Sequence, residues 1–240
     1  MSNEVPFTTD RRTGQLRAPR NTAPRAAGPW DVKREFKELY APANRDWELV
    51  EVPAQRFLAV DGRGDPNLAP AYTEAVEALY AVAYAIKFAA KRGIGRDLVV
   101  APLEGLWYVG DPGDAADPAG FAVFAAGDKA AWSWTMLISQ PAWVTDAFIA
   151  EVVTATAAKK KLPALASVRI ESLDEGRCAQ LLHVGPYDAE APALARLHGS
   201  FLAGHGLVPN GRHHEVYLGD PRRTAADKLK TVLRQPVAPA

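Results

Sequence analysis

The chain has 240 residues, of which 48% are hydrophobic and 23% charged, so it can bury the core of a globular protein. Its 28 basic residues balance 28 acidic ones, which leaves no net charge to attract nucleic acid or an anionic membrane surface. The single cysteine, Cys178, has no internal disulfide partner, and we find neither a signal segment nor an apolar run of roughly 18 residues, which favours a cytoplasmic protein without membrane partners.

Residues 1–30 alternate arginine and proline with few apolar positions, a composition typical of a disordered, weakly basic tail. We therefore predict that the folded domain spans residues 31–240. It begins with a short helix, because Val32 and Phe36 recur at helical spacing before Pro42 ends the pattern.

A first set of elements is predicted between about residues 47 and 141. Short β-branched and aromatic runs indicate strands, and a long alanine-rich run without internal glycine or proline indicates a helix that ends at Gly93. In chain order we expect strands at 48–53 and 56–60, a helix at 70–92, and strands at 99–109 and 131–140, the last two joined by a long connection at 110–130. A further helix at 144–160 connects this set to the next.

A second set follows between about residues 165 and 237 in the same order. It has strands at 168–173 and 177–183, a helix at 190–205, and closing strands at 214–218 and 229–234. Each half is thus strand, helix, strand, strand. That order predicts an α+β fold with antiparallel pairing.

Sequence landmarks support a duplication. One glutamate interrupts an apolar strand pattern closed by Gly-Asp-Pro in each half, in Pro102-Leu-Glu-Gly-Leu-Trp-Tyr-Val-Gly-Asp-Pro112 and in His213-His-Glu-Val-Tyr-Leu-Gly-Asp-Pro221. Leu137-Ile-Ser-Gln-Pro141 is likewise echoed by Val232-Leu-Arg-Gln-Pro236. If the copies pair about a pseudo-two-fold axis, Glu104 and Glu215 should approach it from opposite sides of a shared cleft.

These stretches resemble the GyrI-like small-molecule-binding domains, and the resemblance covers roughly residues 32–237. Besides the two glutamate strands it rests on Leu182-His-Val-Gly-Pro-Tyr-Asp188 and Leu79-Tyr-Ala-Val-Ala-Tyr-Ala-Ile-Lys-Phe88. The resemblance implies a curved antiparallel sheet with two helices framing a central groove, which has aromatic residues on its floor and a carboxylate at its base. Family members include drug-sensing domains of transcription regulators, a gyrase-inhibiting protein and free-standing hydrolases of cyclopropane-containing DNA-alkylating compounds.

The chain has no recognisable helix-turn-helix and looks most like the free-standing hydrolases. Burial and a second carboxylate both raise a carboxyl pKa, so one of two paired acids keeps a proton at neutral pH while the other activates water. We therefore predict that Glu215 and Glu104 are catalytic, that an electrophilic cyclopropane is hydrolysed as detoxification, and that no cofactor is needed. A non-catalytic drug-binding or sensing module and a gyrase-interacting protein stay open as alternatives, as do a monomer and a homodimer.

The ligand expected is hydrophobic and planar, because flat aromatic walls with few polar groups suit such a molecule. Strand alternation places Glu215 on one face with His213 and Tyr217, and Glu104 on another with Tyr108. Trp107 would face away unless a bulge near Gly105 re-aims it, and a core position is equally open for it. The predicted ligand-binding residues are Tyr84, Trp107, Tyr108, Trp134, His183, Tyr187, His213 and Tyr217, although Tyr84 and Trp134 also suit the core.

Other chemistries lack support. His213 and His214 point to opposite strand faces, and the remaining histidines have no ligand-like spacing, so we predict no metal site. Neither a phosphate-binding glycine loop nor a Gly-x-Ser-x-Gly elbow is present. Cys178 lies in an apolar strand pattern and is expected to be a small buried residue.

Overall fold

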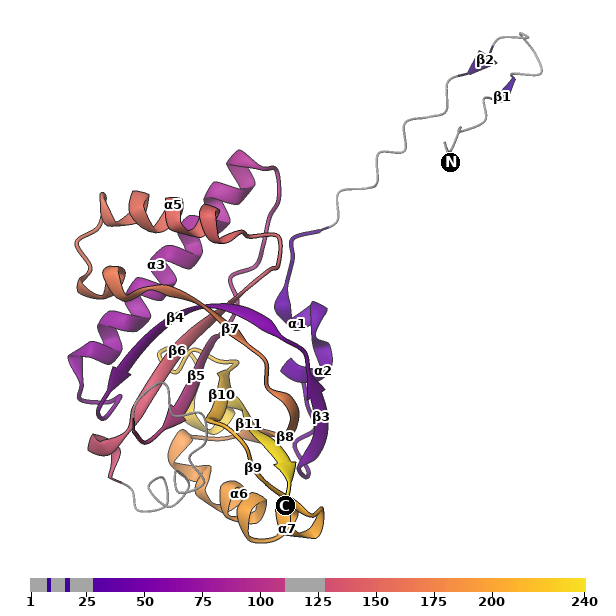
Figure 1. Cartoon of the computed structure of the whole chain (residues 1–240), viewed down its shortest axis with the longest axis vertical. Coiled ribbons are helices and arrows are strands. Elements are labelled where there is room, and N and C mark those ends of the chain that lie inside the picture. Colours follow the sequence, from indigo (N-terminus) through magenta and orange to yellow (C-terminus); the bar gives the residue numbers. More distant parts are fainter. Residues whose placement is uncertain (1–7, 10–15, 18–27, 111–127) are drawn as a thin grey trace.

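A nine-stranded antiparallel sheet forms the centre of the computed structural model, which describes residues 8–9, 16–17, 28–110 and 128–240 (Figure 1). Within the predicted tail, β1 (Thr8–Thr9) and β2 (Leu16–Arg17) pair with each other. The other tail residues up to 27, and most of the predicted connection at 110–130, lie outside the described residues.

The strand order of the large sheet has two-fold symmetry. The order is β3-β8-β11-β10-β5-β6-β4-β7, with β9 added beside β11. The first repeat supplies β3 (Glu48–Val52), β4 (Gln55–Arg63), β5 (Leu103–Tyr108) and β6 (Ser133–Gln140). The second supplies β7 (Arg169–Leu173), β8 (Gly176–Val184), β9 (Leu207–Pro209), β10 (His213–Tyr217) and β11 (Lys230–Pro239). The predicted duplicated α+β fold is confirmed: β5 and β10 meet at the centre, and each repeat lends its first strand to the far edge of the other.

Each repeat has one main helix. In the first it is α3 (Pro70–Gly93), and in the second it is α6 (Ala191–Arg196), continued by the π-helical η4 (Leu197–Phe201) and by α7 (Leu202–Gly204). The connecting helix is α5 (Asp146–Ala157), and α1 (Val32–Glu35) and α2 (Lys37–Tyr40) precede the sheet. Short 3₁₀ turns complete the set: η1 (Lys129–Ala131), η2 (Pro163–Ser167), η3 (Tyr187–Ala189) and η5 (Ala226–Lys228).

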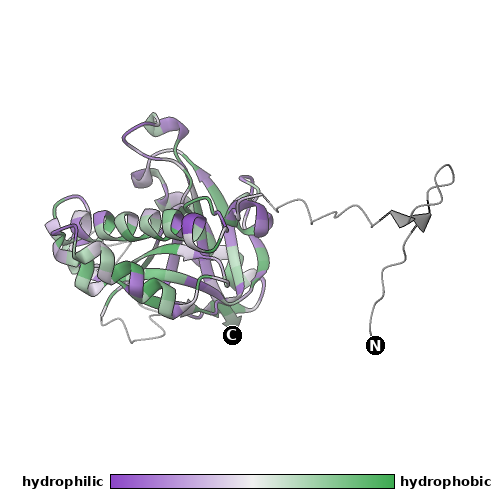
Figure 2. Cartoon of the chain, turned by 90° about the horizontal axis from the view of Figure 1, so that it is seen from above, coloured by the Kyte–Doolittle hydropathy of each residue, from purple (hydrophilic) through white to green (hydrophobic). Residues whose placement is uncertain are grey.

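The long helix α3 follows from its sequence. Proline occupies its first position, where no backbone N–H is needed, and Lys91 and Arg92 lie in the last turn, where cations interact favourably with the helix dipole. Its buried stripe packs on β4 and β6 and consists of Ala75, Ala78, Leu79, Val82, Ala83, Ile86 and Ala90. Figure 2 shows the resulting mixture of hydrophobic and hydrophilic residues along the helices.

Both repeat helices cover the same face of the sheet. Directly opposed residues in an antiparallel ladder point to the same side, so one row of side chains can be followed from strand to strand. The row that starts beneath α3 and ends beneath α6 is Val60, Met136, Gly105, Glu215, Leu233 and Leu181. The opposite face is covered near its centre by α2, whose Tyr40 and Leu39 bond to Glu104 and Arg234, and α1 lies beside α2 (Figure 1).

Candidate functional site

The register of the two central strands separates the predicted catalytic glutamates. Glu215 lies opposite Gly105, whereas Glu104 lies opposite Val216, one position further along the ladder. Since neighbouring residues of a strand point to opposite faces, the two carboxylates lie on opposite sides of the sheet. The expectation that they share a cleft is therefore wrong. The five-pair ladder centres on Gly105 and Glu215, so the two-fold axis relates Glu104 to His214, not to Glu215.

On the Glu215 face, three polar side chains form a hydrogen-bonded chain. Trp107 Nε1–H donates to the Tyr217 hydroxyl at 2.8 Å, and that hydroxyl donates to Glu215 Oε2 at 2.8 Å. Trp107 reaches this face through an uninterrupted ladder in which it opposes His213, so no bulge is needed to aim it. Tyr217 gives the carboxyl group of Glu215 an oriented donor, and the Glu215 side chain remains 12% exposed.

Gly105 makes this arrangement possible. A Cβ at this position would lie 3.0 Å from Trp107 Nε1 and 3.2 Å from the Tyr217 hydroxyl. Contacts that short are tighter than normal, so both groups, and the terminal methyl of Met136 at 3.1 Å, would have to shift by a few tenths of an ångström. The glycine in the Leu-Glu-Gly-Leu-Trp-Tyr pattern therefore provides room for the polar chain above the sheet.

Aromatic rings surround the hydrogen-bonded side chains of Trp107, Tyr217 and Glu215. Tyr72, in the first turn of α3, stacks on Trp107 with ring centroids 6.4 Å apart, and Trp132 contacts the edge of Trp107 at 5.5 Å. From the second repeat, Tyr187 meets Tyr217 edge-on at 5.6 Å and is 37% exposed. Such walls offer flat apolar contact with a polar group at their base.

The tyrosines of this face retain their protons. Burial, reinforced by the charge of Glu215, raises the pKa of Tyr72 and of Tyr217 well above the usual value. For Tyr187, burial and the charges of Glu190 and Glu215 raise the pKa to about 12. All three hydroxyls are therefore hydrogen-bond donors at neutral pH.

A second acid of this face, Glu190, was missed by the sequence analysis. It precedes the first residue of α6, its side chain caps no backbone N–H, and it is 5% exposed. Burial, with the nearby charge of Glu215, raises the pKa of Glu190 to about 10, so it is protonated at neutral pH. Acids are common at helix N-termini for reasons of stability alone, so the sequence contained no signal that set this one apart.

Of the other predicted ligand-binding residues, His213 lies beside Glu215, His183 contacts a turn, and Trp134 belongs to the core. His213 lies on the Glu215 face, with Nε2 3.6 Å from Glu215 Oε1, and His183 Nε2 lies 3.1 Å from the Pro186 carbonyl oxygen. Trp134 is fully buried behind Tyr72, in edge contact at 5.3 Å, which makes it a core residue.

Two predicted aromatics lie away from Glu215. Tyr84 is 48% exposed on the outer surface of α3, where its ring stacks on Phe88. Tyr108 lies on the opposite face of the sheet, with its hydroxyl 3.3 Å from Thr135 Oγ1. The structure therefore does not bring Tyr108 together with Tyr217.

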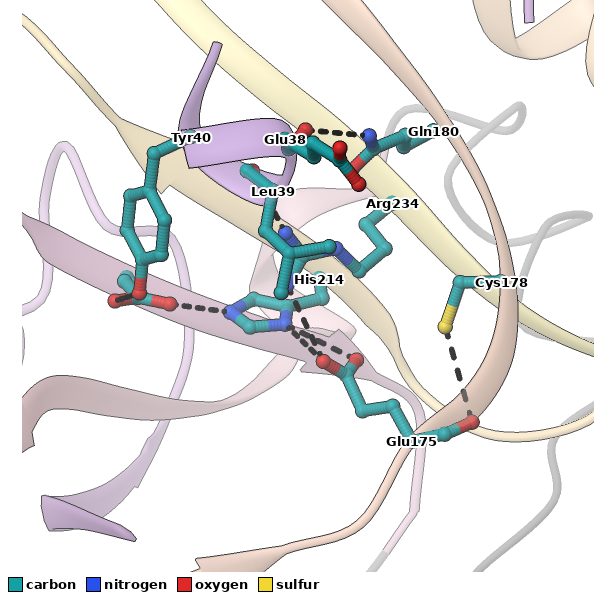
Figure 3. Close-up of polar contacts among 9 residues, drawn as sticks. Glu38, Leu39, Tyr40, Glu175, Cys178, Gln180, His214 and Arg234 are labelled. Atoms are coloured by element: carbon teal, nitrogen blue, oxygen red, sulfur yellow. Dashed lines mark hydrogen bonds and ion pairs between the residues drawn. The ribbon is translucent and has the colours of Figure 1, made fainter. Parts of the chain in front are cut away.

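Glu104 belongs to a buried ionic network on the opposite face, of which Figure 3 shows Tyr40, His214, Glu175 and Arg234. The Tyr40 hydroxyl donates to Glu104 Oε1 at 2.7 Å, and His214 Nε2 lies 3.1 Å from Glu104 Oε2. His214 Nδ1 lies 3.0 Å from Glu175, and Arg234 Nη1 is 3.3 Å from the same carboxylate. The side chains of Glu104, His214, Glu175 and Arg234 are each at most 4% exposed, so this network is closed to solvent.

Opposite charges stabilise this network. Burial lowers the pKa of His214, but the charge of Glu175 and hydrogen bonds to both glutamates outweigh burial and raise the pKa to about 9. Burial likewise raises the pKa of Glu175, yet His214 and Arg234 lower it to about 2. A charged imidazolium therefore links two strands and a turn, which is a structural role.

Within the described ranges, no three His, Cys, Asp or Glu side chains gather as a metal site would require. Across the same ranges, no helix is both long and apolar enough to cross a membrane.

Two strand–helix–strand–strand repeats, with an acid and aromatic rings between their helices, define a small-molecule-binding domain. The family model of the GyrI-like small molecule binding domain matches residues 133–238. An uncharacterized conserved protein from Listeria innocua is 37% identical, with a TM-score of 0.75 over 87% of this chain and 100% of the other. This protein belongs to the GyrI-like family.

Two further solved structures are similar. A hydrolase encoded by lin2189 from Listeria innocua is 36% identical, with a TM-score of 0.74 over 88% of this chain and all of the other. A structure described as a hydrolase from the same organism is 36% identical, with a TM-score of 0.72 over 87% of this chain and all of the other. A comparison with curated proteins found no match.

Proposed function

We propose that this protein hydrolyses electrophilic, cyclopropane-containing small molecules, with Glu215 as the general base. The observation that carries the proposal is the chain from Trp107 through Tyr217 to Glu215, which orients one partly exposed carboxylate beneath aromatic rings. Similar proteins that are described as hydrolases, at 36% identity over nearly the whole chain, support it.

The reaction needs only a base and stabilisation of negative charge. Glu215 accepts a proton from a water molecule as the water oxygen bonds to a methylene carbon of the strained ring. The carbon–carbon bond that breaks releases its electron pair toward a conjugated carbonyl oxygen, which then takes up a proton. Protonated hydroxyls of Tyr72 and Tyr187 at the same face supply donors for the developing oxyanion.

A second candidate function is binding without turnover. One carboxylate beneath aromatic faces also suits a hydrophobic cation, through charge attraction and cation–π contact. In that case the protein would sequester or sense its ligand and release it unchanged. The two functions differ in whether the ligand gains a water molecule.

Replacing the base distinguishes them. The protein should convert a cyclopropane-bearing alkylating compound to its water adduct, detected by mass spectrometry, and Glu215→Gln should slow this by about 10²- to 10⁴-fold with affinity maintained. Glu151→Gln, the same change at an exposed position of α5, should react like the wild type. If no adduct forms and Glu215→Gln only weakens the binding of a cationic ligand, the protein is a binding module.

A further inference from the structure

Glu190 is the buried acid of the Glu215 face that the proposed reaction does not use. Its Oε1 atom is buried and makes no hydrogen bond of normal geometry within the described part of the chain, although the Thr231 hydroxyl lies close enough to act on the carboxyl group. A carboxyl oxygen in that situation is costly unless a ligand supplies the partner. The side chain also makes no capping bond to α6, so the helix does not account for its position.

The surroundings of Glu190 keep its proton in place. The groups that face it are Glu215 and Tyr217 of β10, Thr231 of β11, Tyr187 and Asp188 of η3, and Lys129 of η1. Burial is the largest influence and the charge of Glu215 the next, and together they outweigh the opposing effects of Thr231 and Lys129. The face therefore holds one acceptor carboxylate and one neutral carboxylic acid.

We propose, on the basis of the function above, that Glu190 binds substrate directly and donates a hydrogen bond to the carbonyl oxygen that becomes negative. The two acids then have opposite tasks: Glu215 accepts a proton from water, and Glu190 stabilises the electron pair released by the ring. The ligand chemistry that this pair recognises is an aromatic or conjugated ring carrying an anionic oxygen.

A phenolate tests this role without any turnover. 4-Nitrophenolate carries an anionic oxygen on a planar ring, and its absorbance reports its ionisation when bound. At pH 8, Glu190→Gln should weaken its binding roughly 5- to 50-fold, because an amide is a poorer donor to an anion than a carboxylic acid. Wild-type affinity should fall as the pH approaches about 10, where Glu190 ionises, and the affinity of the variant should not.

Whether Glu190→Gln weakens or strengthens phenolate binding tests the proposed role of Glu190. An ionised Glu190 would repel the phenolate, so tighter binding by Glu190→Gln would overturn the proposal, as would a wild type that does not bind the probe. Glu151→Gln should bind like the wild type, and melting temperatures of all variants report their folding. Weaker phenolate binding by Glu190→Gln, in a protein that forms no water adduct, would retain the role of Glu190 and reject the hydrolase.

Discussion

At the scale of single residues, the site depends on the absence of one side chain. Gly105 sits directly opposite Glu215, and the space that its missing Cβ leaves is shared by Trp107 Nε1 and the Tyr217 hydroxyl. A Cβ at position 105 would therefore crowd the hydrogen-bonded side chains that orient Glu215. A glycine within a strand, usually a weakness, here has a positive function.

We expect Gly105→Ala to disrupt the site while leaving the fold intact. The methyl group would displace Trp107 and Tyr217, costing about 1–3 kcal/mol of stability and lowering turnover or affinity at least about tenfold. Ligand binding and thermal melting measure both effects. Gly199→Ala is the matched control, because a Cβ there meets nothing within 4 Å; equal losses in both variants would argue against a specific role for Gly105.

The residue scale is also where sequence reasoning reached its limit. Glu215, Tyr217 and Tyr187 were predicted, and the structure groups them. Glu104 was paired with Glu215 because both interrupt similar strand patterns, but a shift of one residue reverses the face of a side chain. Such a shift is invisible in the sequence, since each strand alternates in the same way in either register.

At the scale of elements, β10 joins two different environments. Its alternate residues carry Glu215 and Tyr217 on one face and His214 on the other. The ionic network behind β10 is covered by α2, whose Tyr40 hydroxyl reaches Glu104 and whose Leu39 carbonyl oxygen accepts from Arg234 at 2.9 Å. The position of β10 thus depends on a helix at the start of the domain.

Tyr40→Phe should therefore weaken the fold without directly changing the site. Removing the hydroxyl leaves Glu104 buried with one donor fewer, at a cost of about 1–3 kcal/mol. Tyr84→Phe removes the same atom from an exposed ring of α3 and should change the stability by no more than about 0.5 kcal/mol. Denaturant unfolding compares the two; equal stabilities would mean that α2 does not anchor the network.

Most elements were predictable because their patterns are local. The strands of both repeats and the helices α3 and α5 occupy the expected ranges to within a few residues. The three-residue β9 and the π-helical interruption of the second repeat helix were not anticipated. Phe36 also divides the first predicted helix into α1 and α2. Its backbone angles, φ −119° and ψ 54°, are not helical, and the side-chain pattern does not predict them. These features arise from packing between distant segments.

At the scale of the whole molecule, the two faces of the sheet respond to pH in the same direction above neutrality. His214 has a pKa of about 9 in the folded chain and an ordinary value of 6.5, so its contribution to stability is complete below pH 6.5 and is lost as the pH rises through 9. Glu190 has an ordinary pKa of 4.5 and a folded pKa of about 10, so its contribution to stability is complete below pH 4.5 and is lost progressively up to pH 10, because its carboxyl group ionises first in the unfolded chain.

Acid pH affects the stability of the fold through Glu175. The pKa of Glu175 is held at about 2, so its stabilising contribution is present above pH 4.5 and is lost as the pH falls through 2. The three groups together predict a melting temperature that is highest near pH 4.5, declines above it as the contribution of Glu190 is lost, and declines more steeply above pH 6.5, where the contribution of His214 is lost as well. Glu190→Gln should remove the decline in melting temperature that Glu190 causes. The melting temperature of the variant relative to the wild type should therefore increase from pH 5 to pH 9. A wild-type melting temperature that rises between pH 6.5 and 9, or a constant difference between wild type and variant, would contradict the charge states assigned to His214 and Glu190.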